Sequence, residues 1–146
     1  LKLPAHITLQ IPFRIPDENE SGLVELLKFF VAKQSGFTIK VSGFKKFSNR
    51  VIFADVETKQ PVIELCERLQ KLLTSNLDLK DHEKTNKIHP HFTLASRDLD
   101  YRTFPLVWAD FKDREFQDFF QAKSIFLLKH NGKSWDVFKE FEFAKR

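Results

Sequence analysis

The sequence predicts an α+β fold in which antiparallel sheets line a central cleft and helices cover the outside. Three observations point to it. Stretches in which polar and apolar residues alternate, as in half-buried strands, are separated by stretches with apolar residues at helical spacing. Their order reads strand, helix, two strands, and this unit is written twice along the 146 residues. Each copy opens with the same four-residue pattern, His-apolar-Thr-Leu.

The first half of the chain predicts a strand, a helix, a hairpin and a second helix. The opening segment alternates between polar and apolar side chains and is bracketed by prolines. Two later alternating stretches are joined by Ser48-Asn49, a short polar turn typical of a hairpin, so their strands are expected to pair antiparallel. The expected elements are a strand at 5–13, a helix within 17–34, strands at 37–47 and 50–57, and a helix at 60–76.

The second half repeats this order after a polar loop at residues 78–88. Residues 91–96 alternate as the first strand does. Aromatic residues three to four positions apart predict a packed helix over 104–120. Asn131-Gly132 then separates two alternating stretches within 123–143, and Asn-Gly in that setting is the strongest short-range hairpin signal.

One domain over residues 1–146 is expected, because 42% hydrophobic and 30% charged residues are the balance of an ordinary soluble protein. The repeated unit divides this domain into lobes at about 1–76 and 77–146, related by a pseudo-two-fold axis. The chain starts at Leu1 and contains no Met. We therefore expect a strand and a helix to precede residue 1 in the full protein.

Composition argues against several classes of protein. Cys66 is the only cysteine, so no disulfide framework or cysteine–metal cluster is possible, and the reducing cytoplasm is the expected compartment. No stretch approaches the roughly 20 apolar residues that cross a bilayer, so a membrane is not expected as a partner. A net charge of +4 is far from the dense basic surfaces of dedicated nucleic-acid-binding proteins.

The repeated pattern reads HITL from His6 and HFTL from His91. In a strand, side chains two positions apart point to the same face, so each histidine shares a face with the threonine of its motif, Thr8 or Thr93. The apolar residues of each motif point to the other face and anchor the strand in the core. If the two strands lie side by side, two imidazoles and two hydroxyls meet in one cleft.

Two histidines can act as the base and the acid of a phosphoryl transfer at neutral pH. One takes a proton from the attacking water, the other gives a proton to the departing oxygen, and the threonine hydroxyls hold the phosphate oxygens. Arg97, at the end of the second strand, is expected to add positive charge for the phosphate. The scheme needs no metal and no cofactor. A metal site is not expected at His82, His89 and His91 with the nearby Asp78, Asp81 and Glu83, because their spacing matches no common ligand pattern and the segment reads as a solvated loop.

The two His-x-Thr motifs resemble those of the 2H phosphoesterase superfamily, and the chain is most similar to its bacterial 2′-5′ RNA ligase / RNA 2′,3′-cyclic phosphodiesterase branch. The stretches GFKKFSNRVIFADVE, PVIELCERLQKLL and HPHFTLASR match that branch as well, so the resemblance covers nearly all of the chain. It implies a bilobal fold with His6 and His91 as the catalytic pair and Thr8 and Thr93 as the phosphate-holding hydroxyls. The implied reaction is the metal-free opening of a 2′,3′-cyclic phosphate on an RNA end or a nucleotide.

Two other functions stay open at this point. A protein with the same cleft could bind RNA ends or nucleotides without catalysis, and a phosphoesterase of the same fold could act on another diester, such as a cyclic ADP-ribose derivative or a 2′-5′ oligoadenylate. Ligation of RNA ends is also a family activity, but release of ring strain makes hydrolysis the downhill direction. The sequence does not assign the base and the acid, nor the oligomeric state, for which a monomer is the simplest expectation.

Overall fold

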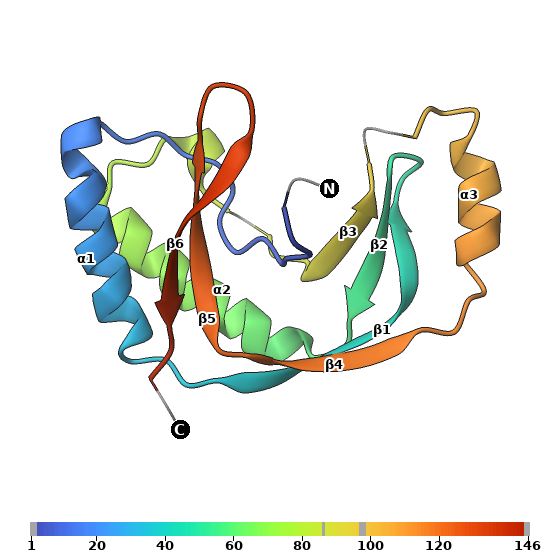
Figure 1. Cartoon of the computed structure of the whole chain (residues 1–146), viewed down its shortest axis with the longest axis horizontal. Helices are drawn as coiled ribbons and strands as arrows, with labels where there is room; N and C mark the ends of the chain where they lie inside the picture. Colours follow the sequence, from blue (N-terminus) through green and yellow to red (C-terminus); the bar gives the residue numbers. More distant parts are fainter. Residues whose placement is uncertain (1–2, 86, 97–98, 145–146) are drawn as a thin grey trace.

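The computed structural model describes residues 3–85, 87–96 and 99–144, in which three α-helices and six strands are found (Figure 1). In chain order these are α1 (Glu20–Val31), β1 (Phe37–Phe47), β2 (Val51–Val56), α2 (Lys59–Asn76), β3 (His91–Ala95), α3 (Phe104–Phe111), β4 (Gln117–Ala122), β5 (Ser124–His130) and β6 (Trp135–Glu142). Short 3-10 turns lie at Asp17–Asn19 and Asp81–Glu83.

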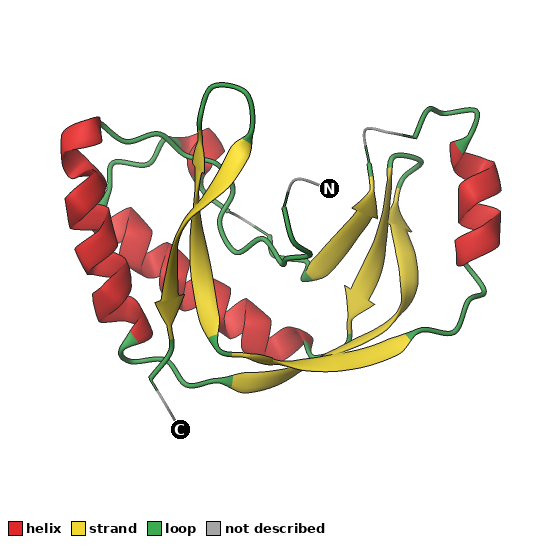
Figure 2. Ribbon diagram, in the orientation of Figure 1, coloured by secondary structure: helices red, strands yellow, loops and turns green. Residues whose placement is uncertain are grey.

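The strands form a four-stranded sheet in the order β3-β2-β1-β4 and a two-stranded sheet of β5 and β6. Every pairing between these strands is antiparallel. The sheets meet where β4 runs into β5 (Figure 1). α1 and α3 lie at opposite ends of the molecule, and α2 crosses behind β5 between them (Figure 2). A cleft of about 2120 Å³ is lined by both sheets, through Phe120 of β4, Phe126 of β5 and Phe138 of β6 among others. The expected α+β fold, with antiparallel sheets around a cleft and helices outside, is confirmed.

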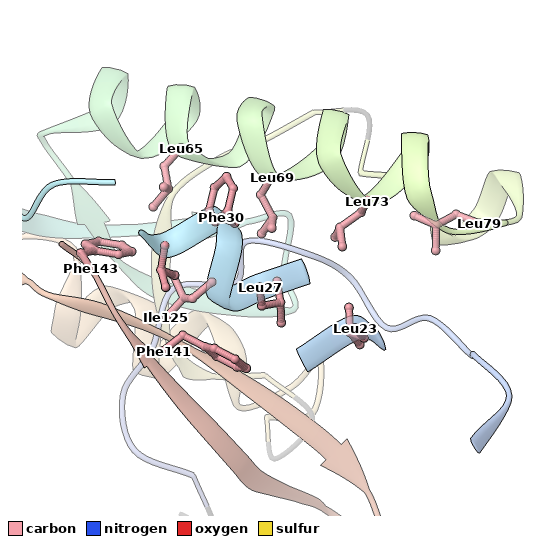
Figure 3. Close-up of a cluster of buried hydrophobic side chains, with 11 residues drawn as sticks. Leu23, Leu27, Phe30, Leu65, Leu69, Leu73, Leu79, Ile125, Phe141 and Phe143 are labelled. Carbon is pink, nitrogen blue, oxygen red and sulfur yellow. The ribbon is translucent and has the colours of Figure 1, made fainter. Parts of the chain in front are cut away.

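The largest core lies between α1, α2 and the β5–β6 hairpin (Figure 3). Each helix contributes leucines spaced three to four positions apart, which an α-helix brings to one face. The buried side chains of this core are Leu23, Leu27, Phe30, Val31, Leu65, Leu69, Leu73, Leu79, Ile125, Phe141 and Phe143. A smaller core of Ile39, Val41, Ala54, Val56 and Val62 joins α2 to the four-stranded sheet. The packing of α2 against both cores fixes the relative positions of the two sheets.

Replacement of Leu69 by alanine is expected to lower the free energy of unfolding by about 2–5 kcal/mol, because it leaves a cavity in the largest core. Leu69 is 4% exposed and lies in the middle of α2. Chemical denaturation followed by circular dichroism measures the change. The matched control is Leu106→Ala on α3, where the side chain is 74% exposed and the expected change is within about 0.5 kcal/mol. Equal destabilisation by the two variants would contradict the assignment of this core.

Both predicted hairpin turns are confirmed. Ser48 has a φ of 45° between β1 and β2, and Gly132 has a φ of 96° between β5 and β6. Left-handed φ values of this kind are what the tight turns of hairpins require, and glycine adopts them without steric cost. The side chain of Asn131 supports the second turn, because its Oδ1 accepts hydrogen bonds from the backbone N–H groups of Lys133 and Ser134.

The expected strand over residues 5–13 is wrong, since this segment has no ladder partner among the described residues. Side chains of other elements satisfy part of its backbone instead. The Thr85 hydroxyl accepts from Ile11 N–H at 3.4 Å, and Cys66 Sγ donates to Leu9 O at 3.4 Å. Burial raises the pKa of the Cys66 thiol to about 12, so the thiol keeps the proton that it donates. The alternation of the segment persists, because Ile7 and Leu9 pack against the cores.

The helix expected over 104–120 is correct only for its first half. α3 ends at Phe111, and residues 117–122 form β4, which pairs with residues 37–42 of β1. The spacing of the aromatic residues predicts a helix over the whole segment. Its second half instead forms backbone hydrogen bonds with β1, a partner that the local sequence pattern cannot reveal. The four-stranded sheet therefore combines strands from both sides of the boundary expected at residues 76 and 77. A single domain over the chain stays a prediction.

Candidate active site

The second His-x-Thr motif lies on β3, an edge strand whose register with β2 fixes the direction of its side chains. His91 is opposite Asp55, Phe92 is opposite Ala54 and Thr93 is opposite Phe53. Because paired residues share a face, His91 and Thr93 lie on one face of the sheet. Phe92 lies on the other face and packs against the smaller core, as the alternation predicted.

Leu94 departs from the anchoring role that the alternation predicted for it. The side chain is 44% exposed and lines the cleft instead of being buried. Of the two apolar residues of the motif, Phe92 is the one that packs against a core. Thr93 is exposed and His91 is half-buried, so both polar side chains of the motif are accessible to a ligand.

The imidazole of His91 is held by a hydrogen bond and by two aromatic rings. Its Nδ1 lies 2.5 Å from the backbone carbonyl oxygen of His89. The rings of Phe47 and Phe53 contact it edge to face, at centroid distances of 4.9 and 5.1 Å. A carbonyl oxygen can only accept, so Nδ1 carries the proton of the neutral ring and Nε2 is left as the acceptor.

The first motif has the same local geometry at His6. Its Nδ1 lies 2.9 Å from the carbonyl oxygen of Pro4, again two residues earlier in the chain. The neutral ring therefore also has its proton on Nδ1 and a free acceptor at Nε2. His6 and Thr8 are both exposed. The two motifs thus present their imidazoles in the same tautomer, although only one of them lies on a strand.

A network of polar side chains ties the first motif to the segment that leads into the second. The carboxylate of Glu83 accepts from the backbone N–H of Arg14 at 2.7 Å and from that of Lys80 at 2.8 Å. Gln10 donates to the carbonyl oxygen of Glu83 at 2.7 Å and also contacts Gln70 of α2. These bonds replace the strand pairing that residues 5–13 lack, and they hold the segment that carries His6 against the rest of the fold.

Glu83→Gln is expected to lower the melting temperature at pH 7. Hydrogen bonds from the backbone N–H of Lys80 and then of Arg14 lower the pKa of Glu83 from its ordinary value of 4.5. A lowered folded-state pKa means that the carboxylate contributes stability above pH 4.5 and that this contribution is lost as the pH falls through the folded value. The difference between wild type and variant should therefore shrink in melts recorded below pH 4.5. Glu142→Gln, at an exposed position of β6, is the control and should match wild type at every pH.

The cleft brings together some of the predicted site residues and leaves others out. His6 and Thr8 line it, whereas β3 contributes Phe92 and Leu94 to its wall. His91 and Thr93 lie on the opposite face of β3, and no hydrogen bond or aromatic contact among the described residues joins them to His6 or Thr8. Convergence of the two motifs on one substrate therefore stays a prediction. Arg97 lies outside the described residues.

Comparison with known proteins identifies the family. The sequence profile of the 2′-5′ RNA ligase superfamily matches residues 1–134. The chain belongs to this superfamily. Proteins of Bacillus cytotoxicus and Geobacillus kaustophilus, each named "Putative phosphoesterase", are 27% and 29% identical to it. These alignments cover 98% and 95% of this chain, and 81% and 78% of the two relatives.

Two solved structures have the same fold as this superfamily member. The protein TT0787 of Thermus thermophilus matches with a TM-score of 0.64 and 19% sequence identity, over 99% of this chain and 82% of that one. A crystal structure described as a phosphoesterase matches with a TM-score of 0.65 and 18% identity, over 95% of this chain and 76% of that one. Together with the family match, these findings confirm a 2H phosphoesterase at the level of the superfamily.

Residues around the second motif add to the candidate site of this 2H phosphoesterase. Phe47 and Phe53 hold the His91 ring, and Asp55 lies beside it across the sheet. Sequence patterns did not single out these residues, although Asp55 is the one charged residue of β2. No group of three or more His, Cys, Asp or Glu side chains in the described part of the chain is arranged to hold a metal ion. None of the described helices has the length and apolar character needed to cross a membrane.

Proposed function

We propose that the protein hydrolyses 2′,3′-cyclic phosphates on RNA ends or nucleotides, with His6 and His91 as its acid–base pair. The matching tautomer of the two imidazoles is the observation that supports this most. In each motif Nδ1 is bonded to the carbonyl oxygen two residues earlier, at 2.9 Å for His6 and 2.5 Å for His91. Each Nε2 can therefore accept a proton when the ring is neutral and donate one when it is charged.

The proposed reaction moves one proton at each histidine. The neutral ring accepts a proton through Nε2 from a water molecule as the water oxygen bonds to phosphorus. The bond between phosphorus and one ribose oxygen then breaks, and the charged ring donates its Nε2 proton to that oxygen. The product is an open ribose monophosphate, commonly the 2′-phosphate by family resemblance. Thr8 and Thr93 donate hydrogen bonds to the non-bridging oxygens, where negative charge develops. No step passes through a metal or a cofactor.

Phosphorus NMR of product formation tests the proposed substrate. The protein is incubated with each 2′,3′-cyclic nucleotide and with RNA that ends in a cyclic phosphate, with and without EDTA. We expect the cyclic resonance to be replaced by that of a monoester at the same rate in both conditions. Loss of turnover in EDTA would overturn the metal-free mechanism. Tight binding of cyclic-phosphate RNA without turnover would instead favour a binding module.

A diester other than a 2′,3′-cyclic phosphate is the second candidate substrate. Parallel incubations with a 2′-5′ oligoadenylate and with a cyclic ADP-ribose derivative test it under the same conditions. Hydrolysis of either compound at a higher kcat/KM than any 2′,3′-cyclic phosphate would replace the proposed substrate while keeping the two-histidine chemistry.

A further inference from the structure

A buried carboxylate with two ammonium partners lies next to His91. Asp55 is 6% exposed and is paired with His91 across β2 and β3, which brings the two Cβ atoms to about 4.5–5.5 Å. Its Oδ2 lies 2.9 Å from Nζ of Lys45 and 3.5 Å from Nζ of Lys59. Its Oδ1 is buried and has no hydrogen-bond partner among the described residues. The carboxylate therefore draws both ammonium groups toward the face of the sheet that carries His91.

The cluster of Asp55, Lys45 and Lys59 has the charge and the free donors needed to bind an anion. Two ammonium groups and one carboxylate leave one positive charge, and the Lys45 and Lys59 side chains are 56% and 41% exposed. Each ammonium has three N–H donors and makes one contact with Asp55, so further donors on each point to solvent. Exposed lysines ordinarily lose much rotamer entropy when they bind a ligand. Asp55 already restrains both lysine side chains, so less side-chain entropy is lost when they bind an anion.

We propose that Lys45 and Lys59, held by Asp55, form an anion subsite beside His91 for a substrate phosphate other than the one attacked. This inference rests on the proposed function. It names the substrate class as cyclic phosphates that carry a further phosphate group. Register supports a separate subsite, because Lys45 and Thr93 lie opposite the same residue of β2 and are thus two strands apart, about 9.5 Å. That spacing separates the backbones of the two residues, and we assign the phosphate held by Thr93 and the one held by the lysines to different groups of the substrate.

Lys46 provides a matched control on the same strand. Successive residues of a strand point to opposite faces of the sheet, so the side chain of Lys46 lies on the face opposite to that of Lys45. Its Nζ donates to Asn49 Oδ1 at 3.2 Å and lies 5.8 Å from the ring of Trp108 on α3. Lys46→Gln removes the same charge from the neighbouring position, and it leaves the Asp55 cluster intact.

The test compares adenosine 2′,3′-cyclic phosphate with and without a 5′-phosphate. Wild type is expected to have the higher kcat/KM for the 5′-phosphorylated substrate. Lys45→Gln and Lys59→Gln should each reduce the ratio of kcat/KM for the 5′-phosphorylated substrate to kcat/KM for the other substrate by about tenfold. This is the change expected when one charge-assisted hydrogen bond is lost. Lys46→Gln should keep the wild-type ratio. Lys45→Arg, which keeps the charge, should restore at least part of the preference, and thermal melts identify any variant that fails to fold.

Binding of inorganic pyrophosphate by calorimetry separates the subsite from the proposed function. If neither substrate is hydrolysed but Lys45→Gln and Lys59→Gln weaken pyrophosphate binding while Lys46→Gln does not, the subsite stands and the proposed function fails. If both substrates are hydrolysed and the three variants have the same substrate ratio as wild type, the subsite is wrong. Equal loss of kcat/KM for both substrates also overturns it, because the lysines then act on the attacked phosphate.

Discussion

His6→Ala and His91→Ala should each lower kcat for hydrolysis of a 2′,3′-cyclic nucleotide by about 10²- to 10⁴-fold, the usual contribution of a general acid or base. Each substitution removes an Nε2 that either accepts the proton of water or gives a proton to the departing ribose oxygen. His6 is exposed and His91 is half-buried on an edge strand, so the loss of activity is expected without loss of the fold. Initial rates and circular dichroism of the same samples measure both properties.

His130→Ala is the matched control for the histidine variants. His130 lies at the end of β5, where its Nδ1 accepts from the backbone N–H of Gly132, and it belongs to neither motif. We expect kcat within about twofold of wild type. The double variant of His6 and His91 should lose little more than either single variant, because residues that act as a unit are not additive. Full activity in either single variant would remove that histidine from the mechanism.

Thr8→Val and Thr93→Val should each lower kcat by about 10²- to 10³-fold, as for loss of one donor to a developing negative charge. Valine has nearly the shape of threonine and suits extended backbone, so the substitution removes the hydroxyl and little else. Both threonines are exposed, and stability should change by less than about 0.5 kcal/mol. Steady-state kinetics should assign the loss mainly to kcat, because the hydroxyls bind the transition state more strongly than the substrate.

Thr74→Val on α2 is the control for the threonine variants. Its hydroxyl donates to the Gln70 carbonyl oxygen within the same helix, away from both motifs. This variant should keep the wild-type kcat. A rise in KM with unchanged kcat in the Thr8 and Thr93 variants would contradict their assignment to the transition state, since it would mean that they bind substrate and transition state equally.

Local sequence signals predicted the elements whose structure depends on local interactions. The turns at Ser48-Asn49 and Asn131-Gly132 were predicted because left-handed backbone favours particular residues. α1 and α2 were predicted because helical spacing marks a buried face. Residues 5–13 and 117–122 were assigned wrongly because pairing partners decide whether an alternating or aromatic segment becomes a strand. Those partners lie far away in the sequence, as β1 does for β4.

In the candidate site, too, the sequence predicted what depends on local interactions and missed what depends on distant residues. Alternation along β3 correctly separated His91 and Thr93 from Phe92, because the side-chain period of a strand is a local property. The hydrogen bonds from Nδ1 of His6 and His91 to the carbonyl oxygens of Pro4 and His89 could not be predicted, since they depend on backbone geometry. Neither could the place of Asp55 beside His91, which follows from the register of β2 with β3.

The pH dependence of kcat/KM, measured in EDTA with a 2′,3′-cyclic nucleotide, tests the acid–base pair most directly. A mechanism in which one histidine must be neutral and the other charged predicts a bell-shaped profile. His6→Ala should abolish one limb and His91→Ala the other, each on a strongly lowered rate. A profile that keeps both limbs in both variants, or activity that returns only when a divalent metal is added, would contradict the account.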